Sequence, residues 1–155
     1  MLIVDSREKW TQHDRPPANS IGDWFLRHGV NYRVQKLDVG DYMLDGGSVT
    51  VDTKQDLEEL SRNLMNRADH ARFMKEVRRA RERGLRLVVL CRHGGKIKTL
   101  QDVAGWKSRY SPVNGRALLN EIYRVHISYG VEFAFCDKRS TGKKILEILK
   151  KDIVL

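Results

Sequence analysis

Residues 40–54 read GDYMLDGGSVTVDTK, and this stretch decides the fold that the sequence predicts. Alternating side chains lead up to Leu44, turn-forming residues occupy 45–48, and the apolar run 49–51 follows, a pattern typical of a β-hairpin. Two strands joined by so short a turn must be antiparallel. The second strand runs directly into an Asp-Thr-Lys triplet, so the pattern predicts a carboxylate and an ammonium group at the end of a strand.

Strand and helix patterns alternate on both sides of the hairpin. Apolar runs and helical periodicity predict strands at 2–4, 32–44, 49–51, 85–91 and 131–136 and helices at 19–29, 57–64, 69–83, 99–108, 115–128 and 141–151. This alternation is typical of the α/β class, and the hairpin makes its central sheet mixed, with helices flanking it. The run 85–91 is the most apolar strand, and we expect it at the centre of the sheet. The length suits a single domain, residues 1–155.

The charge of the chain favours a polyanionic partner. Its 29 Lys and Arg residues exceed its 20 Asp and Glu residues and give a formal net charge of +9, which attracts nucleic acid before any specific contact forms. No stretch approaches the roughly 20 apolar residues that cross a bilayer, so no membrane partner is expected. Charged residues within 1–10 exclude the apolar segment of a signal peptide. A cytoplasmic protein is therefore expected, either nucleoid-associated or encoded by a phage or mobile element.

The two cysteines, Cys91 and Cys136, each lie in an apolar run. A free cysteine in such a run behaves as a small buried hydrophobe in a reducing compartment. No second Cys or His stands beside either of them at ligand spacing. The sequence therefore predicts structural thiols and gives little support to a zinc site.

Asp41 and Asp52 lie on the two arms of the predicted hairpin, and its turn brings both within reach of one divalent cation. Hydrolysis of a phosphodiester needs such a cation to neutralise the phosphate and to help generate hydroxide. Lys54 follows Asp52 by two residues, so strand alternation points both side chains to one face. Taken alone, this triplet fits a solvated surface ion pair more often than an active site.

The first strand ends in a polar cluster, Asp5-Ser6-Arg7-Glu8. Because Asp5 emerges from an apolar strand, we expect it to serve as a metal ligand or as an orienting group. The guanidinium of Arg7 suits a two-pronged contact with the scissile phosphate. Glu8 fits either an additional acid of the site or a salt-bridge network at the sheet edge.

These pieces follow one another as in the nuclease domain of the XPF-type structure-specific endonucleases, which the chain resembles. Residues 5–8 are similar to the family's Asp-x-Arg-Glu, residues 40–42 to its Gly-Asp-Tyr, residues 51–54 to its Val-Glu-Arg-Lys, and residues 71–73 to its small-Arg-apolar element. The resemblance covers residues 1–92. The combined order is more specific than any single piece, and it implies a restriction-endonuclease-like PD-(D/E)xK fold.

The resemblance implies a metal-dependent DNA endonuclease that acts on branched, flap or junction DNA in repair or recombination. It implies Mg²⁺ or Mn²⁺ held by Asp41 and Asp52 with help from Asp5. Lys54 and Arg7 are then the further catalytic residues. These enzymes generally pair, so a homodimer is also implied.

Three departures from the family's pattern stand out. Asp52 replaces its Glu and shortens the ligand by one methylene, although the wider superfamily accepts either acid. Thr53 replaces its Arg and removes a cation that would support the site or the DNA backbone. In the family, three residues separate the lysine from a final acid, which a leucine follows. Glu58 has that spacing from Lys54, whereas Asp56 has the leucine after it, so both are candidates.

Cations are dense on the two helices after the hairpin and in the loop after the apolar strand, where they predict a track for the DNA backbone. The candidates are Arg62, Arg67, Arg72, Lys75, Arg79, Lys96 and Lys98. Any one of these arginines fits a solvated helical face better. Trp106 is expected either to stack on an unpaired base or to pack in the core. His70, His93 and His126 are expected at the surface, since a lysine-based mechanism needs no histidine.

Two rival functions stay open at this point. A catalytically silent DNA-binding or scaffolding module keeps the fold and loses the acids, so the presence of Asp41, Asp52 and Lys54 favours an enzyme. A junction resolvase from the wider superfamily differs in substrate alone. The apolar stripe within 115–128 is either the interface of the implied homodimer or part of the core.

Overall fold

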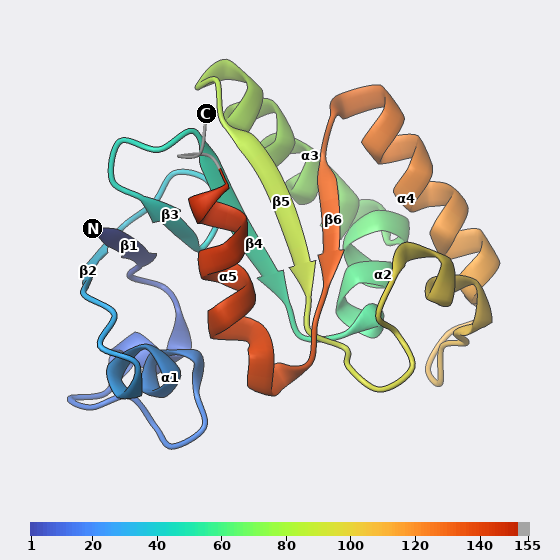
Figure 1. Cartoon of the computed structure of the whole chain (residues 1–155). Helices are drawn as coiled ribbons and strands as arrows, with labels where there is room; N and C mark the ends of the chain where they lie inside the picture. The colour runs from blue at the N-terminus through green and yellow to red at the C-terminus, as the bar shows by residue number, and fades with distance from the viewer. Residues whose placement is uncertain (152–155) are drawn as a thin grey trace.

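The computed structural model describes residues 1–151, and residues 152–155 of the predicted domain lie outside the described part. A six-stranded sheet has the order β2-β1-β3-β4-β5-β6 (Figure 1). The strands are β1 (Leu2–Asp5), β2 (Tyr32–Gln35), β3 (Tyr42–Leu44), β4 (Val49–Lys54), β5 (Arg86–Cys91) and β6 (Glu132–Phe135). The helices are α1 (Ile21–Arg27), α2 (Leu57–Met65), α3 (Arg67–Glu82), α4 (Gly115–Tyr129) and α5 (Thr141–Lys150), with short 3-10 helices η1 (Lys9–Gln12), η2 (Leu100–Gly105) and η3 (Lys138–Ser140).

Strand β3 runs antiparallel to both of its neighbours, β1 and β4. The pairs β1–β2, β4–β5 and β5–β6 are parallel. The predicted hairpin and mixed sheet are therefore confirmed. Because the strands other than β3 all point the same way, their carboxyl ends meet at one edge of the sheet, and β3 begins at that same edge. We call it the carboxyl edge.

Helices cover both faces of the sheet. Helices α2, α3 and α4 lie on one face, and α1 and α5 lie on the other, where α5 contacts β3 and β4 (Figure 1). Strand β5 alternates between these layers: Leu87, Val89 and Cys91 pack on the first face, and Val88 and Leu90 pack on the second. Burial on both faces explains its unbroken apolar run. No helix within residues 1–151 has the length and apolar character needed to cross a bilayer.

The segment predicted as one strand, 32–44, forms two. Strand β2 pairs with one side of β1, and the chain then passes the end of β1 to enter β3 on its other side. Leu37 and Val39 in the connecting loop are buried, with 5% and 2% of their surface exposed. These inward-pointing residues continue the alternation of the strand, so periodicity alone did not reveal the break.

Two further predictions need correction. Strand β5 is paired on both sides, but it lies next to last in the sheet, and β3 and β4 occupy the middle. The helix predicted at 99–108 is limited to the 3-10 helix η2, which Thr99 and Asp102 start with a capping box. Only Val103 is buried within η2. So little apolar surface does not support a longer amphipathic helix.

The apolar stripe on α4 belongs to the core. Leu118, Ile122 and Val125 are fully buried and pack in the same cluster as Cys91, so they are not free to form a dimer interface. Cys91 is a free thiol, and burial raises its pKa to about 12. It is therefore the inert structural cysteine that the sequence predicted. Cys136 is also a free thiol and is half-buried.

Gly40 provides a test of how the hairpin is built. Its φ of +75° lies in the left-handed region, and an added Cβ would come within 2.1 Å of Thr50 Oγ1. We expect Gly40→Ala to lower the free energy of unfolding by about 3 kcal/mol, from backbone strain plus overpacking. Gly46 has a φ of +73° with nothing within 4 Å of an added Cβ, so Gly46→Ala should cost only about 1–2 kcal/mol. Urea denaturation measures both, and equal losses would contradict the close approach of Gly40 to Thr50.

Candidate active site

The carboxyl edge of the sheet gathers the acids of the candidate site. The loop after β1 supplies Glu8, the residue before β3 is Asp41, and the end of β4 carries Asp52 and Lys54. Helix α3 adds Glu76, on which the charge of Asp52 acts. We call Glu8, Asp41, Asp52 and Glu76 the acidic cluster. Its position follows from the topology, because open α/β sheets place their ligand crevices at this edge.

Asp41 is fixed by the hairpin and by Thr53. Its N–H donates to the carbonyl of Val51 at 2.7 Å. Its carboxylate accepts two hydrogen bonds from Thr53, from the N–H at 2.9 Å and from the hydroxyl at 3.0 Å. Thr53 stands where the resembling family has Arg, so this departure exchanges a cation for an anchor of the first aspartate.

Asp52 and Lys54 share one face of β4, as their spacing predicts. Lys54 Nζ lies 3.0 Å from Asp52 Oδ2. Asp52 is 6% exposed, and the side chain of Lys54 is 12% exposed. The alternative of a solvated surface pair is therefore wrong. Lys54 Nζ also donates to Asn63 Oδ1 of α2 at 3.4 Å.

The Oδ2 atom of Asp52 is the most unusual atom of the site. It is buried, and within residues 1–151 it accepts no hydrogen bond of normal geometry. Buried carboxylate oxygens are ordinarily satisfied by several donors, because burial removes their hydration. Its one close partner within residues 1–151 is the ammonium group of Lys54, with Nζ at 3.0 Å. A carboxylate oxygen has more than one lone pair, so this contact leaves room for a second cation.

Glu8 is held in its place in the acidic cluster by a chain of two hydrogen bonds. Trp10 Nε1 donates to the hydroxyl of Tyr42 at 2.9 Å, and that hydroxyl donates to Glu8 Oε2 at 2.8 Å. Tyr42 is fully buried. Glu8 is thus held as part of the site, which favours the first of its two predicted roles over a salt bridge, since no ion pair of Glu8 forms within residues 1–151.

Glu76 is the acid that the sequence reasoning missed. It accepts the N–H of Gly40 at 2.7 Å and so braces the residue before Asp41. Its position on α3 could have revealed it. Glu76 follows Phe73 by three residues and precedes Ala80 by four, so it shares a helix face with these two buried residues. An acid on the buried side of an otherwise basic helix points to a specific partner.

The acidic cluster holds more negative charge than its surroundings neutralise. Burial raises the pKa of Asp41 well above its ordinary value, and the charges of Asp52 and Glu8 raise it further. Burial and the charge of Asp52 also raise the pKa of Glu8 and of Glu76. Burial alone would lower the pKa of Lys54, but the neighbouring Asp52 carboxylate outweighs it and the net shift is upward. Lys54 is therefore a firmly charged ammonium group.

Asp5 and Arg7 bind each other beside this cluster. Arg7 Nε donates to Asp5 Oδ2 at 2.9 Å, and Arg7 Nη2 donates to the carbonyl of Leu37 at 2.8 Å. Asp5 Oδ1 accepts the N–H of Leu37 at 2.8 Å. Both oxygens of Asp5 are therefore engaged, as in an orienting group, while the side chain of Arg7 remains 62% exposed.

The two candidates for the family's final acid are engaged elsewhere. Asp56 caps α2 by accepting the N–H of Glu59 at 2.8 Å. Glu58 accepts the hydroxyl of Ser108 at 2.8 Å and the N–H of Arg109 at 2.9 Å. The structure does not bring either carboxylate into hydrogen-bonding contact with the acidic cluster.

The histidines have structural surroundings. His93 is half-buried, and its Nδ1 accepts the N–H of Leu57 at 3.0 Å, so it is not the surface residue that we expected. It helps to start α2. His126 Nδ1 lies 2.8 Å from the carbonyl of Val131. His70 Nδ1 is buried and has no hydrogen-bond partner within residues 1–151.

The predicted DNA-binding cations divide into two groups. Arg79 donates to the carbonyl of Asp38 at 2.9 Å, and Arg72 pairs with Asp69. These two arginines therefore have protein partners. All of the predicted cations are exposed, and Arg62, Arg67, Lys75 and Lys96 form no ion pair within residues 1–151.

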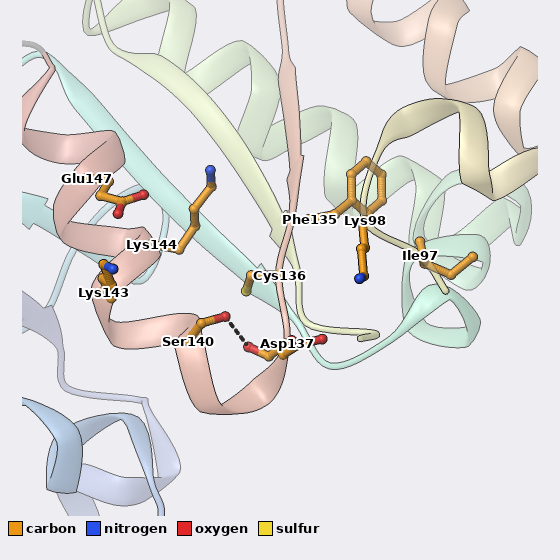
Figure 2. Close-up of a pocket in the computed structure, with 9 residues that line it drawn as sticks. All are labelled: Ile97, Lys98, Phe135, Cys136, Asp137, Ser140, Lys143, Lys144 and Glu147. Carbon is orange, nitrogen blue, oxygen red and sulfur yellow. Dashed lines mark hydrogen bonds between the residues drawn. The ribbon is translucent and has the colours of Figure 1, made fainter. Parts of the chain in front are cut away.

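Lys98 lies apart, in a cavity of about 400 Å³ beside the start of α5. Lys143 and Lys144 line the same cavity, together with the acids Asp137 and Glu147 (Figure 2). Trp106 is half-buried and packs against the core. Of its two predicted roles, core packing is the one that the structure shows.

Comparison with known proteins identifies the fold. The chain is similar to the solved structure of XPF from Aeropyrum pernix, with a TM-score of 0.68 and 20% identity over 99% of this chain and 65% of that one. It is also similar to XPF from Aeropyrum pernix in complex with DNA, with a TM-score of 0.69 and 18% identity over 98% of this chain and 64% of that one. No protein family model and no curated protein matches the sequence.

The fold predicted from the resemblance is therefore confirmed: the chain has the mixed α/β architecture of XPF. It spans slightly less than two thirds of the length of those solved chains.

Asp41 provides a test of the electrostatics of the site. The pKa of its carboxyl is raised in the folded state, so the folded protein loses stability as pH rises above the pKa of the unfolded chain. We expect Asp41→Asn, in buffer with a metal chelator, to increase the free energy of unfolding by on the order of 1 kcal/mol at pH 7.5. The gain should shrink toward pH 4, where the wild-type carboxyl is protonated.

The matched control is Asp45→Asn, because Asp45 has an exposed side chain. The free energy of unfolding of this control variant should differ from that of the wild type by less than about 0.5 kcal/mol at either pH. Urea denaturation at the two pH values measures both variants. A loss of stability in Asp41→Asn at pH 7.5 would contradict the raised pKa.

Proposed function

We propose that this chain, which shares the fold of XPF, is a divalent-metal-dependent endodeoxyribonuclease that hydrolyses phosphodiester bonds in branched, flap or junction DNA. The observation that carries the proposal is the pair of neighbouring acids Asp41 and Asp52, which lie close enough for the charge of Asp52 to raise the pKa of Asp41, with Lys54 Nζ 3.0 Å from Asp52 Oδ2. Two carboxylates beside one ammonium group leave negative charge that a further cation can neutralise. The DNA complex of the similar structure supports nucleic acid as the partner. The net charge of +9 agrees with it.

The donor set fits Mg²⁺ or Mn²⁺. Carboxylate oxygens are the ligands these hard cations prefer, and Mg²⁺ usually takes only one or two of them and completes its shell with water and phosphate. Within residues 1–151, no three Asp, Glu, His or Cys residues are arranged as a complete metal site. We therefore assign the ligands as Asp41 and Asp52, and Glu8 and Glu76, on which the charge of Asp52 acts, would bind water held by the metal. Asp5, whose oxygens are both engaged, orients Arg7.

When bound, the cation would neutralise the phosphate and lower the pKa of a water molecule. The remaining work falls to the chain's own residues. Lys54 places a fixed positive charge beside Asp52, where it would orient the attacking water or stabilise the developing charge. Arg7 already uses Nε and Nη2 for Asp5 and Leu37, so its contact with the phosphate would be through Nη1 instead of the two-pronged contact expected from sequence.

The preference for branched DNA and the homodimer follow the resemblance of the sequence. Because the stripe on α4 is buried, a dimer would need another surface. The absence of a complete three-residue metal site within residues 1–151 is the observation that favours the second candidate, a catalytically silent DNA-binding or scaffolding module.

A cleavage assay separates the two candidates. We expect the chain to cut flap, fork or four-way-junction DNA in the presence of Mg²⁺ or Mn²⁺. Asp52→Asn should slow cutting on the order of a thousandfold, because it removes an interaction worth several kcal/mol in the transition state. Lys54→Met should slow it at least about a hundredfold. The exposed control Asp45→Asn should cut like the wild type.

Absence of cutting by the wild type on every substrate would establish the silent module instead. Symmetric paired nicks confined to four-way junctions would identify a junction resolvase.

Metal binding gives a second readout that does not depend on cutting. A ligand that binds only the folded state stabilises it, by about 1.4 kcal/mol at ten times its dissociation constant. We expect millimolar Mg²⁺ or Mn²⁺ to raise the melting temperature of the wild type and of Asp45→Asn. The double variant Asp41→Asn/Asp52→Asn should show no such rise. An equal rise in all three proteins would place the metal elsewhere.

A further inference from the structure

A second groove lies beside the acidic cluster, on the sheet face that α1 and α5 cover. We call it the α1–α5 groove. It has a volume of about 660 Å³, and its lining includes Trp24, Arg27, His28, Arg92, Lys138 and Arg139. These residues come from α1 and the residue after it, from the residue after β5, and from η3, which precedes α5 at the carboxyl edge (Figure 1). The groove therefore opens at the same edge of the sheet as the acidic cluster.

Arg92 joins this groove to the acidic cluster. The depression that contains Glu8 and Thr53 shares Ser20, Ile21 and Arg92 with the α1–α5 groove. The N–H of Arg92 donates to the carbonyl of Lys54 at 2.8 Å. Its Nε donates to the hydroxyl of Thr141 at 2.9 Å. A chain that runs from the cluster into the groove must therefore pass a fixed guanidinium group.

The groove is strongly cationic. Among the described residues, 1–151, no acid lines it. Arg27 pairs with Asp23, which lies outside the lining, at 3.1 Å. Within residues 1–151, Arg92, Lys138 and Arg139 form no ion pair. Cations that are not paired with an acid attract the phosphates of a nucleic-acid backbone. The cavity in Figure 2 is a weaker candidate because acids line it together with its lysines.

The groove also contains a fixed aromatic stack. The rings of Trp24 and His28 lie 4.0 Å apart and within 15° of parallel. His28 Nδ1 lies 2.8 Å from the carbonyl of Trp24, which fixes its orientation. Trp24 packs against Gly142 of α5, where an added Cβ would come within 2.6 Å of the indole ring. His28 is exposed, so it presents the outer ring of the stack.

A flat ring held in a cationic groove suits unpaired bases, which stack on aromatic side chains while the phosphates bind cations. In a duplex the base faces are already stacked on one another, so the ring has nothing to engage. We infer that the α1–α5 groove binds a single-stranded segment of DNA that continues from the strand held at the acidic cluster. Arg92, Lys138 and Arg139 bind its phosphates, and His28 stacks on a base. The inference rests on the proposed function, and it names the part of the substrate that lies beyond the scissile phosphate.

Binding in the presence of a metal chelator tests the groove without cutting. The probe is a fluorescent oligothymidylate of about 12 nucleotides, within the size range of known single-strand sites. We expect Lys138→Gln/Arg139→Gln to weaken binding about tenfold and to make the dependence of log affinity on log salt shallower by about 1.4. His28→Ala should weaken it about tenfold with the salt dependence unchanged, and His28→Phe, which keeps a ring, should restore it.

The matched control is Arg116→Gln/Lys150→Gln, which removes the same charge from exposed positions outside the groove. It should change affinity less than about twofold, because exposed charges far from the bound strand are screened by salt. Equal losses in the groove and control variants would show nonspecific attraction only and would overturn the inference. An equal loss of duplex binding in His28→Ala would also overturn it, since a base stack acts on unpaired bases.

Asp52→Asn separates this inference from the proposed function. It should bind the oligothymidylate like the wild type while its cutting is lost. If the wild type cuts nothing but the groove variants still lose single-strand binding selectively, the groove stands and the nuclease proposal fails. If the wild type cuts but groove and control variants bind alike, the nuclease proposal stands and the groove fails.

Discussion

The register of the β3–β4 hairpin is the constraint on which the candidate site depends. Tyr42 pairs with Val51, so Asp41 lies beside the stretch of β4 that ends in Asp52 and Lys54. Side chains alternate along a strand, and a slip of one residue would turn Asp52 and Lys54 toward the opposite face. Burial prevents that slip, because Val51 packs in the core beneath α5. The hydrophobic pattern of β4 therefore fixes the position of its polar end, and the chemistry depends on the packing.

This geometry creates an electrostatic conflict that the fold does not resolve by itself. The acidic cluster gathers several carboxylates in a buried place, and Lys54 is the cation that directly contacts Asp52 there. Desolvation and mutual repulsion raise the pKa of Asp41, Glu8 and Glu76, which means that their ionised forms lower the stability of the folded state. Folding alone would favour fewer acids at this edge. A divalent cation offsets the repulsion, so the same excess charge that weakens the fold provides affinity for the metal in the proposed enzyme.

Short-range patterns predicted most of this architecture, and the failures share one cause. The hairpin, the mixed sheet and the contact of Asp52 with Lys54 follow from turns and alternation over a few residues. The break between β2 and β3 does not, because Leu37 in the loop is buried as a strand residue would be. The position of β5 in the sheet and the approach of Glu76 to Gly40 depend on how distant elements pack. The sequence shows which residues are buried or acidic, but long-range pairing decides which of them meet.

The pleat of the sheet also directs two neighbouring cations of the carboxyl edge to different faces. Lys54 and Arg92 are joined through their backbones, since the N–H of Arg92 donates to the carbonyl of Lys54. Their side chains nevertheless lie on opposite faces of the sheet: Lys54 donates to Asn63 of α2, and Arg92 donates to Thr141 of α5. Asp52 contacts Lys54, whereas Glu8 lines the same depression as Arg92, and further cations line the groove beyond Arg92. In the proposed enzyme, a DNA strand attracted by the cations would be led to the acidic cluster, where the same strand without a metal would be repelled. In the proposed enzyme, the binding of metal and of the scissile phosphate would depend on each other, because each supplies the charge that the other requires.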